Sequence, residues 1–475
     1  MRKNYITQLS LTCCQSEHTI GNHVVRDDID GFVLAMEEIF SNKLLRNNIL
    51  ALLKKSLALP EYQGRPGMDY WTLFVLATLR LVIDCDYDRL HNLANHHRQL
   101  RQLLGHGDFD WGYGYRLSTI KANIRLLSEE VIREINLLVV RYGQSLVHPY
   151  SQDKSIHARC DSFVAQTHVH YPTDISLLHD ALSKVINLAG QGLSSLGIPG
   201  LRQYKSQREK LKKLYNKARN SKKHKKGQSM ENAHQAYIAA AQQALAKIDE
   251  KLEALSSNNI VLASHQVIAQ FRTYATTLID QIDRRVLQGE TIPHNEKIFS
   301  LFQPHTEWIV KGKSGVPFEL GIKVAIVQDQ HQFILHHQVM EKQQDAEIAV
   351  SVAQAVKERY GEIDSMSYDR GFWSADNESK LLEVVRKVVL PKKGYLDKKR
   401  QEIEGEKEHV ALRMKHSAVE SGINALQVHG LKKVPDSGIE GYKRYVALGV
   451  LGYNIHKLGA ILLERHYKQM KKNTA

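Results

Sequence analysis

The chain has 475 residues, of which 43% are hydrophobic and 24% are charged. This composition is typical of soluble globular proteins and excludes a disordered chain. The formal net charge of +14 favours an anionic partner. The excess is concentrated, because residues 205–226 contain eleven Lys or Arg and one acid, Glu209, and so supply +10 of the +14. The length allows two or three domains, each with its own core.

The cysteines and the apolar stretches exclude several classes of protein. The four cysteines, Cys13, Cys14, Cys85 and Cys160, form no CxxC pair. We therefore expect neither a disulfide framework nor a thiolate zinc site, and a reducing compartment. No apolar run follows the first residues, so a secretory signal is not expected. The most apolar stretch, 445–463, is interrupted by Asn454 and His456 and predicts a buried helix in a cytoplasmic protein, not a membrane span.

Helical periodicity dominates residues 30–145. The expected helices lie, in chain order, around residues 32–40, around 71–82, from 87 to 104, and after Ser118 and Thr119. Short helices joined by tight turns permit a helix-turn-helix DNA reader. The same pattern is also typical of purely structural bundles.

Five strands are predicted further along the chain, from runs rich in β-branched and aromatic residues. They are expected at residues 163–171, 318–327, 332–340, 363–368 and 384–390. A helix with Ser374 as its N-cap is expected between the last two strands, and Asp174 and Asp345 are also expected to cap helices. The segment between the first two strands is helical in pattern and includes the basic run. The sequence thus predicts a mixed α/β sheet that is interrupted by a helical insertion.

Three acids lie at or beside these elements. Asp161 opens the first strand region, Asp369 directly follows the fourth strand, and Glu420 lies on an expected helix. Converging carboxylates are the ligands that Mg²⁺ or Mn²⁺ prefers, and two such ions about 4 Å apart can hold both oxygens of a phosphodiester displacement. Single acids are more often surface charges or helix caps. An Asp-Arg-Gly turn after a strand, however, lies where open sheets bind ligands.

Five stretches together resemble the DDE-type transposases of bacterial insertion sequences, and among these the group catalogued as ISNCY. In chain order the stretches are 64–105, 161–174 with its His-Tyr-Pro-Thr-Asp ending, 318–324, 368–374 (Tyr-Asp-Arg-Gly-Phe-Trp-Ser), and 416–420 together with Gly430-Leu-Lys-Lys and 445–463. The likeness extends over most of the chain, and the combination in this order is more specific than any single stretch.

The resemblance implies an RNase H-like mixed sheet flanked by helices. The implied domains are an N-terminal helical domain for DNA-end binding and dimerisation (1–145), a catalytic core (146–175 and 305–465), a basic helical insertion (176–304) and a C-terminal tail (466–475). Asp161, Asp369 and Glu420 would be the catalytic residues and would hold two Mg²⁺ or Mn²⁺ ions. The implied activity is metal-dependent cleavage at the ends of an insertion sequence and strand transfer into target DNA. The enzyme would act as a homodimer, without ATP, in the bacterial cytoplasm.

Basic and aromatic residues near these motifs are expected to contact DNA. They are Arg370, Trp373, Lys392, Lys393, Lys415, His416, Lys432 and Lys433 near the motifs, and Lys212, Lys213, Lys222 and Lys223 in the basic run. Many related transposases carry Arg four positions before the glutamate and Lys seven after it. This chain has His416 and Gln427 there, so nearby lysines are expected to supply the charge.

Two of these signals have a second interpretation. Trp373 is expected either to stack on an unpaired base or to be buried in the core. The basic run is expected either to bind several phosphates or to form a solvated helix.

Two alternative functions remain open from the sequence. One is a nuclease of the same fold that cuts DNA without strand transfer. The other is a DNA-binding regulator whose active site has decayed. The chain has no GxxxxGK phosphate loop and no Ser-His-Asp order, so ATP use and acyl transfer find no support.

Overall fold

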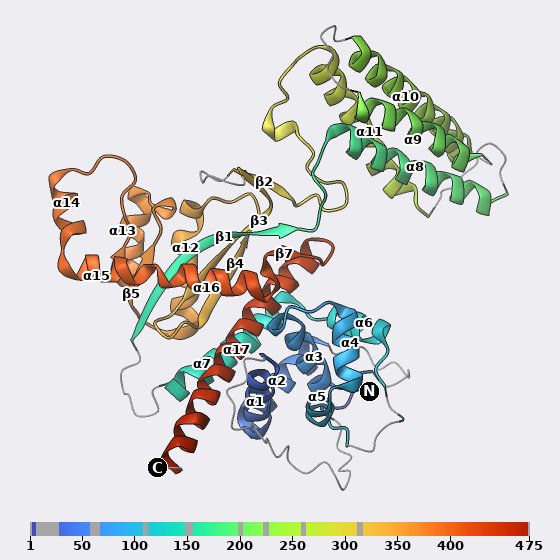
Figure 1. The fold of residues 1–475 in the computed structure, drawn as a ribbon. Coiled ribbons are helices and arrows are strands. Elements are labelled where there is room, and N and C mark those ends of the chain that lie inside the picture. Colours follow the sequence, from blue (N-terminus) through green and yellow to red (C-terminus); the bar gives the residue numbers. More distant parts are fainter. Residues whose placement is uncertain are drawn as a thin grey trace. The chain divides into compact units, whose positions relative to one another are not determined.

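The computed structural model describes residues 2–5, 28–57, 67–107, 112, 114–147, 155–197, 203–221, 228–257, 263–310 and 317–473. The chain divides into two compact units (Figure 1). The first comprises Met1–His168 and Ile309–Ala475, and the second comprises Val169–Trp308. The insertion expected at 176–304 lies within the second unit, and the N-terminal helices lie in the same unit as the sheet.

Among the described residues, seven helices precede the sheet in the first unit. They are α1 (Asp28–Ser41), α2 (Lys43–Ser56), α3 (Tyr70–Val82), α4 (Tyr87–His96), α5 (Arg98–Leu103), α6 (Leu117–Ile124) and α7 (Glu129–Val147). All residues of α3 are buried, and Asp69 caps this helix by accepting a hydrogen bond of 2.8 Å from the Thr72 N–H. These helices share one apolar core with the C-terminal helix and with one face of the sheet.

Two helix predictions in this region are wrong in their boundaries. The single helix expected over 87–104 is divided at His97, which has an extended backbone and caps α5 through its own ring nitrogen. Ser118 and Thr119 lie inside α6, and a second helix, α7, begins only at Glu129. Local capping interactions of this kind end a helix without interrupting its apolar periodicity.

A seven-stranded mixed sheet forms the centre of the first unit. Its strands are β1 (Ile156–Thr167), β2 (Glu307–Val310), β3 (Phe318–Gln328), β4 (Ile334–Met340), β5 (Ile363–Tyr368), β6 (Val385–Val389) and β7 (Lys433–Val434). The order is β2-β3-β1-β5-β6, and in addition β4 pairs with β3 and β7 with β1. β4, β3 and β1 are antiparallel neighbours, whereas β1, β5 and β6 are parallel neighbours.

The predicted strands agree with β3 to β6 to within two residues, but the first strand was placed too late. β1 begins at Ile156 and ends at Thr167, so Asp161 lies inside the strand and does not open it. The first half of β1 was not predicted because His157 and Arg159 interrupt its run of apolar residues. β2 and β7 were not predicted, because runs of four and two residues carry no periodicity.

Helices cover both faces of the sheet. The helices that follow the sheet's first strands are α12 (Asp345–Tyr360), α13 (Ala375–Val384), α14 (Lys398–Gly405), α15 (Lys407–His416), α16 (Ala418–Leu426) and α17 (Ile439–Asn473). One face, with Ala158 and Cys160 of β1, packs against α12 and α13. The other face, with Phe163 and Ala165, packs against α16, α17 and the N-terminal helices. The expected mixed α/β sheet flanked by helices is therefore present.

Helix α17 is the longest in the first unit and covers the stretch 445–463 that was expected to be a buried helix. By length and apolar composition, its Ile439–Gln469 portion could cross a membrane, and 67% of the most apolar window is buried in this structure. A core helix has this degree of burial. The helix continues to Asn473, through most of the segment expected to be a tail.

The second unit is a helical bundle with a separate apolar core. Its long helices are α8 (Asp174–Ser195), α9 (Tyr204–Asn220), α10 (Gln228–Ser257) and α11 (His265–Ile282), followed by the short turns Asp283–Leu287 and His294–Glu296. The cap of α8 is Thr173, which forms a capping box with Ser176. The prediction that Asp174 is the cap is wrong, because this residue is the first in the helix and pairs with Arg285 at 3.1 Å.

Candidate active site

The register of the parallel strands β1 and β5 brings the two predicted aspartates together. Cys160 is paired with Tyr368, so the next residues on the two strands are Asp161 and Asp369. Neighbouring strands lie about 4.8 Å apart. Because residues two apart share a face, Asp161 lies on the same face as Phe163, the face that α16 and α17 cover.

Glu420 lies in the first turn of α16, which packs on β1. Val419 and Leu426 are buried beneath this helix, while Glu420 is exposed. The approach of α16 to the sheet depends on Gly422, since a Cβ there would lie 2.5 Å from the Gln328 Nε2 atom. Gln328 is fully buried and hydrogen-bonded to the Tyr453 hydroxyl at 3.2 Å, so it cannot easily move away.

The electrostatics of Asp161 connect all three predicted acids. Burial raises the pKa of Asp161 to about 7, and the negative charges of Asp369, Asp345 and Glu420 raise it as well. A hydrogen bond of 2.7 Å from the Ser162 N–H acts in the opposite direction. The other three carboxylates, directly after β5 (Asp369), on α12 (Asp345) and on α16 (Glu420), are therefore close enough to disfavour the charge on Asp161 of β1.

Asp345, the fourth of these carboxylates, was expected only to cap a helix. That prediction is wrong, because the cap of α12 is Gln344. Asp345 instead accepts a hydrogen bond of 2.6 Å from the Ser162 hydroxyl and pairs with the Lys323 ammonium at 3.0 Å. A Cβ at Gly371 would lie 3.2 Å from its carboxylate, so the Asp-Arg-Gly turn passes directly beside it. An acid at a helix start gives no sequence signal that separates these two roles.

His416 and Lys415 end α15, next to the acids. The His416 Nδ1 atom is 2.9 Å from the Ser367 hydroxyl, which fixes the ring over β5. Burial lowers the pKa of His416, although the charges of Asp369 and Glu420 favour its protonation. The ring is therefore neutral at pH 7. Lys415 is exposed.

The donor set fits a hard divalent cation. Asp161, Asp369 and Glu420 offer carboxylate oxygens alone, which suits Mg²⁺ or Mn²⁺. Burial is the main cause of the raised pKa of Asp161, and the nearby charges of Asp369, Asp345 and Glu420 add to it. Within the described ranges, no three His, Cys, Asp or Glu side chains already form a closed ligand group. The carboxylates of Asp161, Asp369 and Glu420 repel one another, and a bound cation would bring them closer together.

Several residues that were expected to bind DNA lie around this site at different distances. Arg370 is exposed directly after Asp369. Trp373 is half-buried against the core, with the Lys392 ammonium 5.8 Å from its ring centroid. Lys433 pairs with Gln166 on β1, five residues from Asp161, which corresponds to about 16 Å along the strand. Lys432 is next to it, so the structure places this pair of lysines away from the acids.

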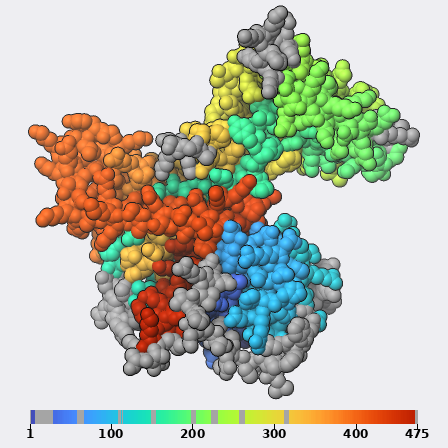
Figure 2. All heavy atoms as spheres, viewed as in Figure 1, coloured from blue at the N-terminus to red at the C-terminus, as the bar shows by residue number. Residues whose placement is uncertain are grey.

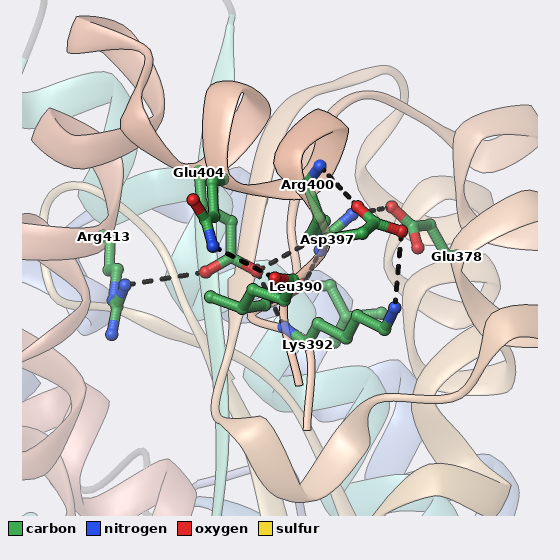
Figure 3. A network of polar contacts seen from close by, with 9 residues as sticks. Glu378, Leu390, Lys392, Asp397, Arg400, Glu404 and Arg413 are labelled. Atoms are coloured by element: carbon green, nitrogen blue, oxygen red, sulfur yellow. Dashed lines mark hydrogen bonds and ion pairs between the residues drawn. The ribbon is translucent and has the colours of Figure 1, made fainter. Parts of the chain in front are cut away.

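The segment between β6 and α15 is held by a buried arginine (Figure 3). Arg400 of α14 forms an ion pair with Glu404 at 2.9 Å and also contacts Glu378 of α13 and the Leu390 carbonyl. Glu404 in turn accepts a hydrogen bond of 2.9 Å from the Lys392 N–H. The basic residues of this segment therefore differ in exposure: Arg400 is buried, whereas Lys393, Lys398 and Lys399 are exposed.

The remaining predicted contacts belong to the second unit. Lys212 and Lys213 are exposed on α9. Lys222 and Lys223 lie outside the described residues. His170 lies beyond the end of β1, and its Nε2 atom is 3.7 Å from the Asp180 carboxylate.

Helices α15 and α16 lie against the strands that carry the aspartates: α15 contacts β5, and α16 contacts β1. In the space-filling view the segment from α15 to the start of α17 forms a continuous orange-red band on the first unit (Figure 2). The acids are thus carried by strands beneath this band and by the band itself. Comparison of the chain with protein-family models, with curated proteins and with solved structures finds no match.

Proposed function

We propose that the protein is a DDE-type transposase that cuts DNA at the ends of an insertion sequence and transfers the freed strand into target DNA. The observation that carries the proposal is the adjacency of Asp161, on β1, and Asp369, which directly follows the neighbouring parallel strand β5, with Glu420 within electrostatic reach. These are the three acids that the sequence resemblance implies for such an enzyme.

An RNase H-like core is part of the same proposal. Its support is a sheet in which three antiparallel strands, β4, β3 and β1, continue into two parallel strands, β5 and β6. The helical second unit lies between β1 and the rest of the sheet in sequence, as the resemblance implies.

The chemistry follows from the acids and their neighbours. A divalent cation held by Asp161, Asp369 and Glu420 would supply positive charge to both oxygens of a phosphodiester displacement. Burial and the neighbouring carboxylates raise the pKa of Asp161 to about 7, and a cation held between these acids would favour the charged form of Asp161 that ligates it. Neutral His416 is oriented by Ser367 beside the acids, where a ring nitrogen can donate to a phosphate oxygen.

The partners that we propose are the terminal DNA of the element, the target DNA and a second copy of the chain. The support is the net charge of +14 and the exposed lysines on α9 and around the acid site. Both favour a phosphate backbone. We place the protein in the bacterial cytoplasm.

The test is a cleavage assay with the DNA that flanks the coding sequence and a supercoiled target plasmid. In Mg²⁺, the wild-type protein should nick the flanking DNA and join it to the plasmid, whereas Asp369→Asn should bind DNA but lose cleavage by a factor of at least about 100. Asp376→Asn is the matched control, because Asp376 is an exposed acid nearby on α13 that pairs with Lys380. It should cleave normally.

Each alternative gives a distinct result in this assay. Nicks without joined products would identify a nuclease of the same fold. DNA binding without Mg²⁺-dependent nicks in the wild type would identify a regulator. Wild-type cleavage by Asp369→Asn would remove the acid site from the proposal.

A further inference from the structure

A pocket of about 330 Å³ lies beside the acid site on the same face of the sheet. Its lining comes from three neighbouring strands and from the helix α15. The lining residues are His157, Ala158 and Arg159 of β1, Ser365, Met366 and Ser367 of β5, Val389 of β6, Leu412 and Lys415 of α15, and Gln330. The volume lies within the range of small-molecule sites in proteins.

The register of the sheet fixes the distance from this pocket to the acids. Arg159 pairs with Ser367, and Ser367 pairs with Val389, so these three residues form one row across the strands. Asp161 and Asp369 occupy the next row on the same face, two residues along, or about 6.6 Å. This separation is comparable with the spacing of successive nucleotides in an extended strand.

Two cations, Arg159 and Lys415, line the pocket. Arg159 is half-buried and donates a hydrogen bond of 3.2 Å to the Asp329 carbonyl, while Lys415 is exposed at the rim. In the part of the chain that the structure describes, neither cation forms an ion pair. The pocket therefore favours an anion.

Part of the pocket lining is apolar. Val389 and Leu412 line it from β6 and from α15. The pocket is also lined by Ser365 and Ser367, whose hydroxyls are hydrogen-bonded to His157 at 2.8 Å and to His416 at 2.9 Å. A phosphate alone would leave most of the volume and the whole apolar wall unused. A phosphate that carries a nucleoside would fill both.

We propose that this pocket binds one nucleotide of the DNA strand adjoining the acid site. The phosphate lies between Arg159 and Lys415, and the nucleoside lies against Val389 and Leu412. The proposal rests on the proposed function only in naming a DNA strand as the source of the nucleotide. The pocket itself requires no cleavage chemistry.

The test measures binding of dTMP, thymidine and inorganic phosphate by titration calorimetry in EDTA, so that divalent ions play no part. The wild-type protein should bind dTMP more tightly than either thymidine or inorganic phosphate. Lys415→Ala should weaken dTMP by about tenfold, because a charged hydrogen bond is lost. Lys407→Ala is the matched control: Lys407 is exposed on the same helix but outside the pocket, and dTMP binding should not change.

A second variant tests the apolar wall. Leu412→Trp should fill the pocket and weaken dTMP by at least tenfold while inorganic phosphate binds as before, and its melting temperature checks that it folds. Equal affinity for dTMP and inorganic phosphate would show that the nucleoside has no site here. Unchanged dTMP affinity in Lys415→Ala would place the phosphate elsewhere. Either result overturns the proposal.

The pocket and the proposed activity can fail separately. Asp369→Asn removes an acid from the next row and leaves the pocket lining intact, so this variant should bind dTMP at least as tightly as the wild type. Loss of dTMP binding in Asp369→Asn would show that the nucleotide occupies the acid site and not the pocket. Absent DNA cleavage with intact dTMP binding would count against the proposed function alone.

Discussion

Asp161 has the most altered chemistry among the acids of the candidate site. Its pKa is about 7 in the folded protein, against an ordinary value near 3.8. Between these two values the folded state holds a proton that the unfolded state has released, so stability falls as pH rises from about 4 to about 7. Above pH 7 the loss is complete and constant. The acid site therefore carries a cost in stability that a bound cation would relieve.

This cost predicts that Asp161→Asn stabilises the protein in EDTA. Asn carries no charge at any pH and can still accept the Ser162 hydrogen bond. At pH 8 the gain should be on the order of a few kcal/mol, and it should decrease steadily towards pH 4. Urea unfolding at pH 4, 6 and 8 measures the difference. A gain that does not depend on pH would contradict the raised pKa.

The sequence identified three of the four clustered carboxylates, and only by resemblance. Spacing alone could not select Asp161, Asp369 and Glu420 from 51 acidic residues. Asp345 was missed because its contacts with Ser162 and Lys323 join residues far apart in the chain. Such contacts are set by strand register, which no local pattern encodes.

At the scale of elements, the segment that leads from β6 to α15 depends on Arg400. This arginine joins α14 to α13 and to the end of β6, and it compensates the buried charge of Glu404 (Figure 3). α15 follows directly and carries Lys415 and His416 to the acid site. The network therefore connects the core to the residues beside the acids.

Arg400→Ala should destabilise the protein by about 3 kcal/mol, because the buried Glu404 then keeps only the Lys392 N–H and the more distant Arg413, at 3.8 Å. Lys399→Ala is the control, since Lys399 is exposed on the same helix and should change the free energy of unfolding by less than about 0.5 kcal/mol. Urea unfolding measures both variants. Equal stability of the two would show that the network contributes nothing.

The elements that the sequence predicted best are those with an uninterrupted pattern. β5 was placed at 363–368, where it is observed, and α13 begins after its Ser374 cap as expected. The start of β1 was missed, since it exposes His157 and half-exposes Arg159 towards α15. These polar residues line the pocket beside the acids. Their polarity is the reason why the sequence pattern did not predict the start of the strand.

At the scale of the whole molecule, the clustered acids and the basic helix α9 belong to different units. The acids belong to the first unit, whereas Lys212 and Lys213 lie on α9 of the second. The sequence predicted this separation from the uneven charge and the helical pattern. It could not predict the strand order, which depends on pairing between residues up to about 200 positions apart, as for Cys160 and Tyr368.

We predict that the second unit supplies non-specific affinity for DNA. Exchanging both Lys212 and Lys213 for Ala should weaken DNA binding and reduce the slope of log affinity against log salt by about 1 for each phosphate that the protein no longer neutralises. Lys247→Ala, at an exposed site on α10, is the control and should keep the wild-type slope. Fluorescence anisotropy with duplex DNA at several salt concentrations provides the measurement. An unchanged slope in the double variant would show that α9 is a solvated helix.

The central claim is that Asp161, Asp369 and Glu420 hold a divalent cation together. Electron paramagnetic resonance of Mn²⁺, titrated into the wild-type protein, Asp161→Asn, Asp369→Asn, Glu420→Gln and the control Asp376→Asn, tests it most directly. We predict that each of the first three substitutions weakens Mn²⁺ binding by at least about tenfold and that the control binds like the wild type. Wild-type Mn²⁺ affinity in any of the three would contradict the claim.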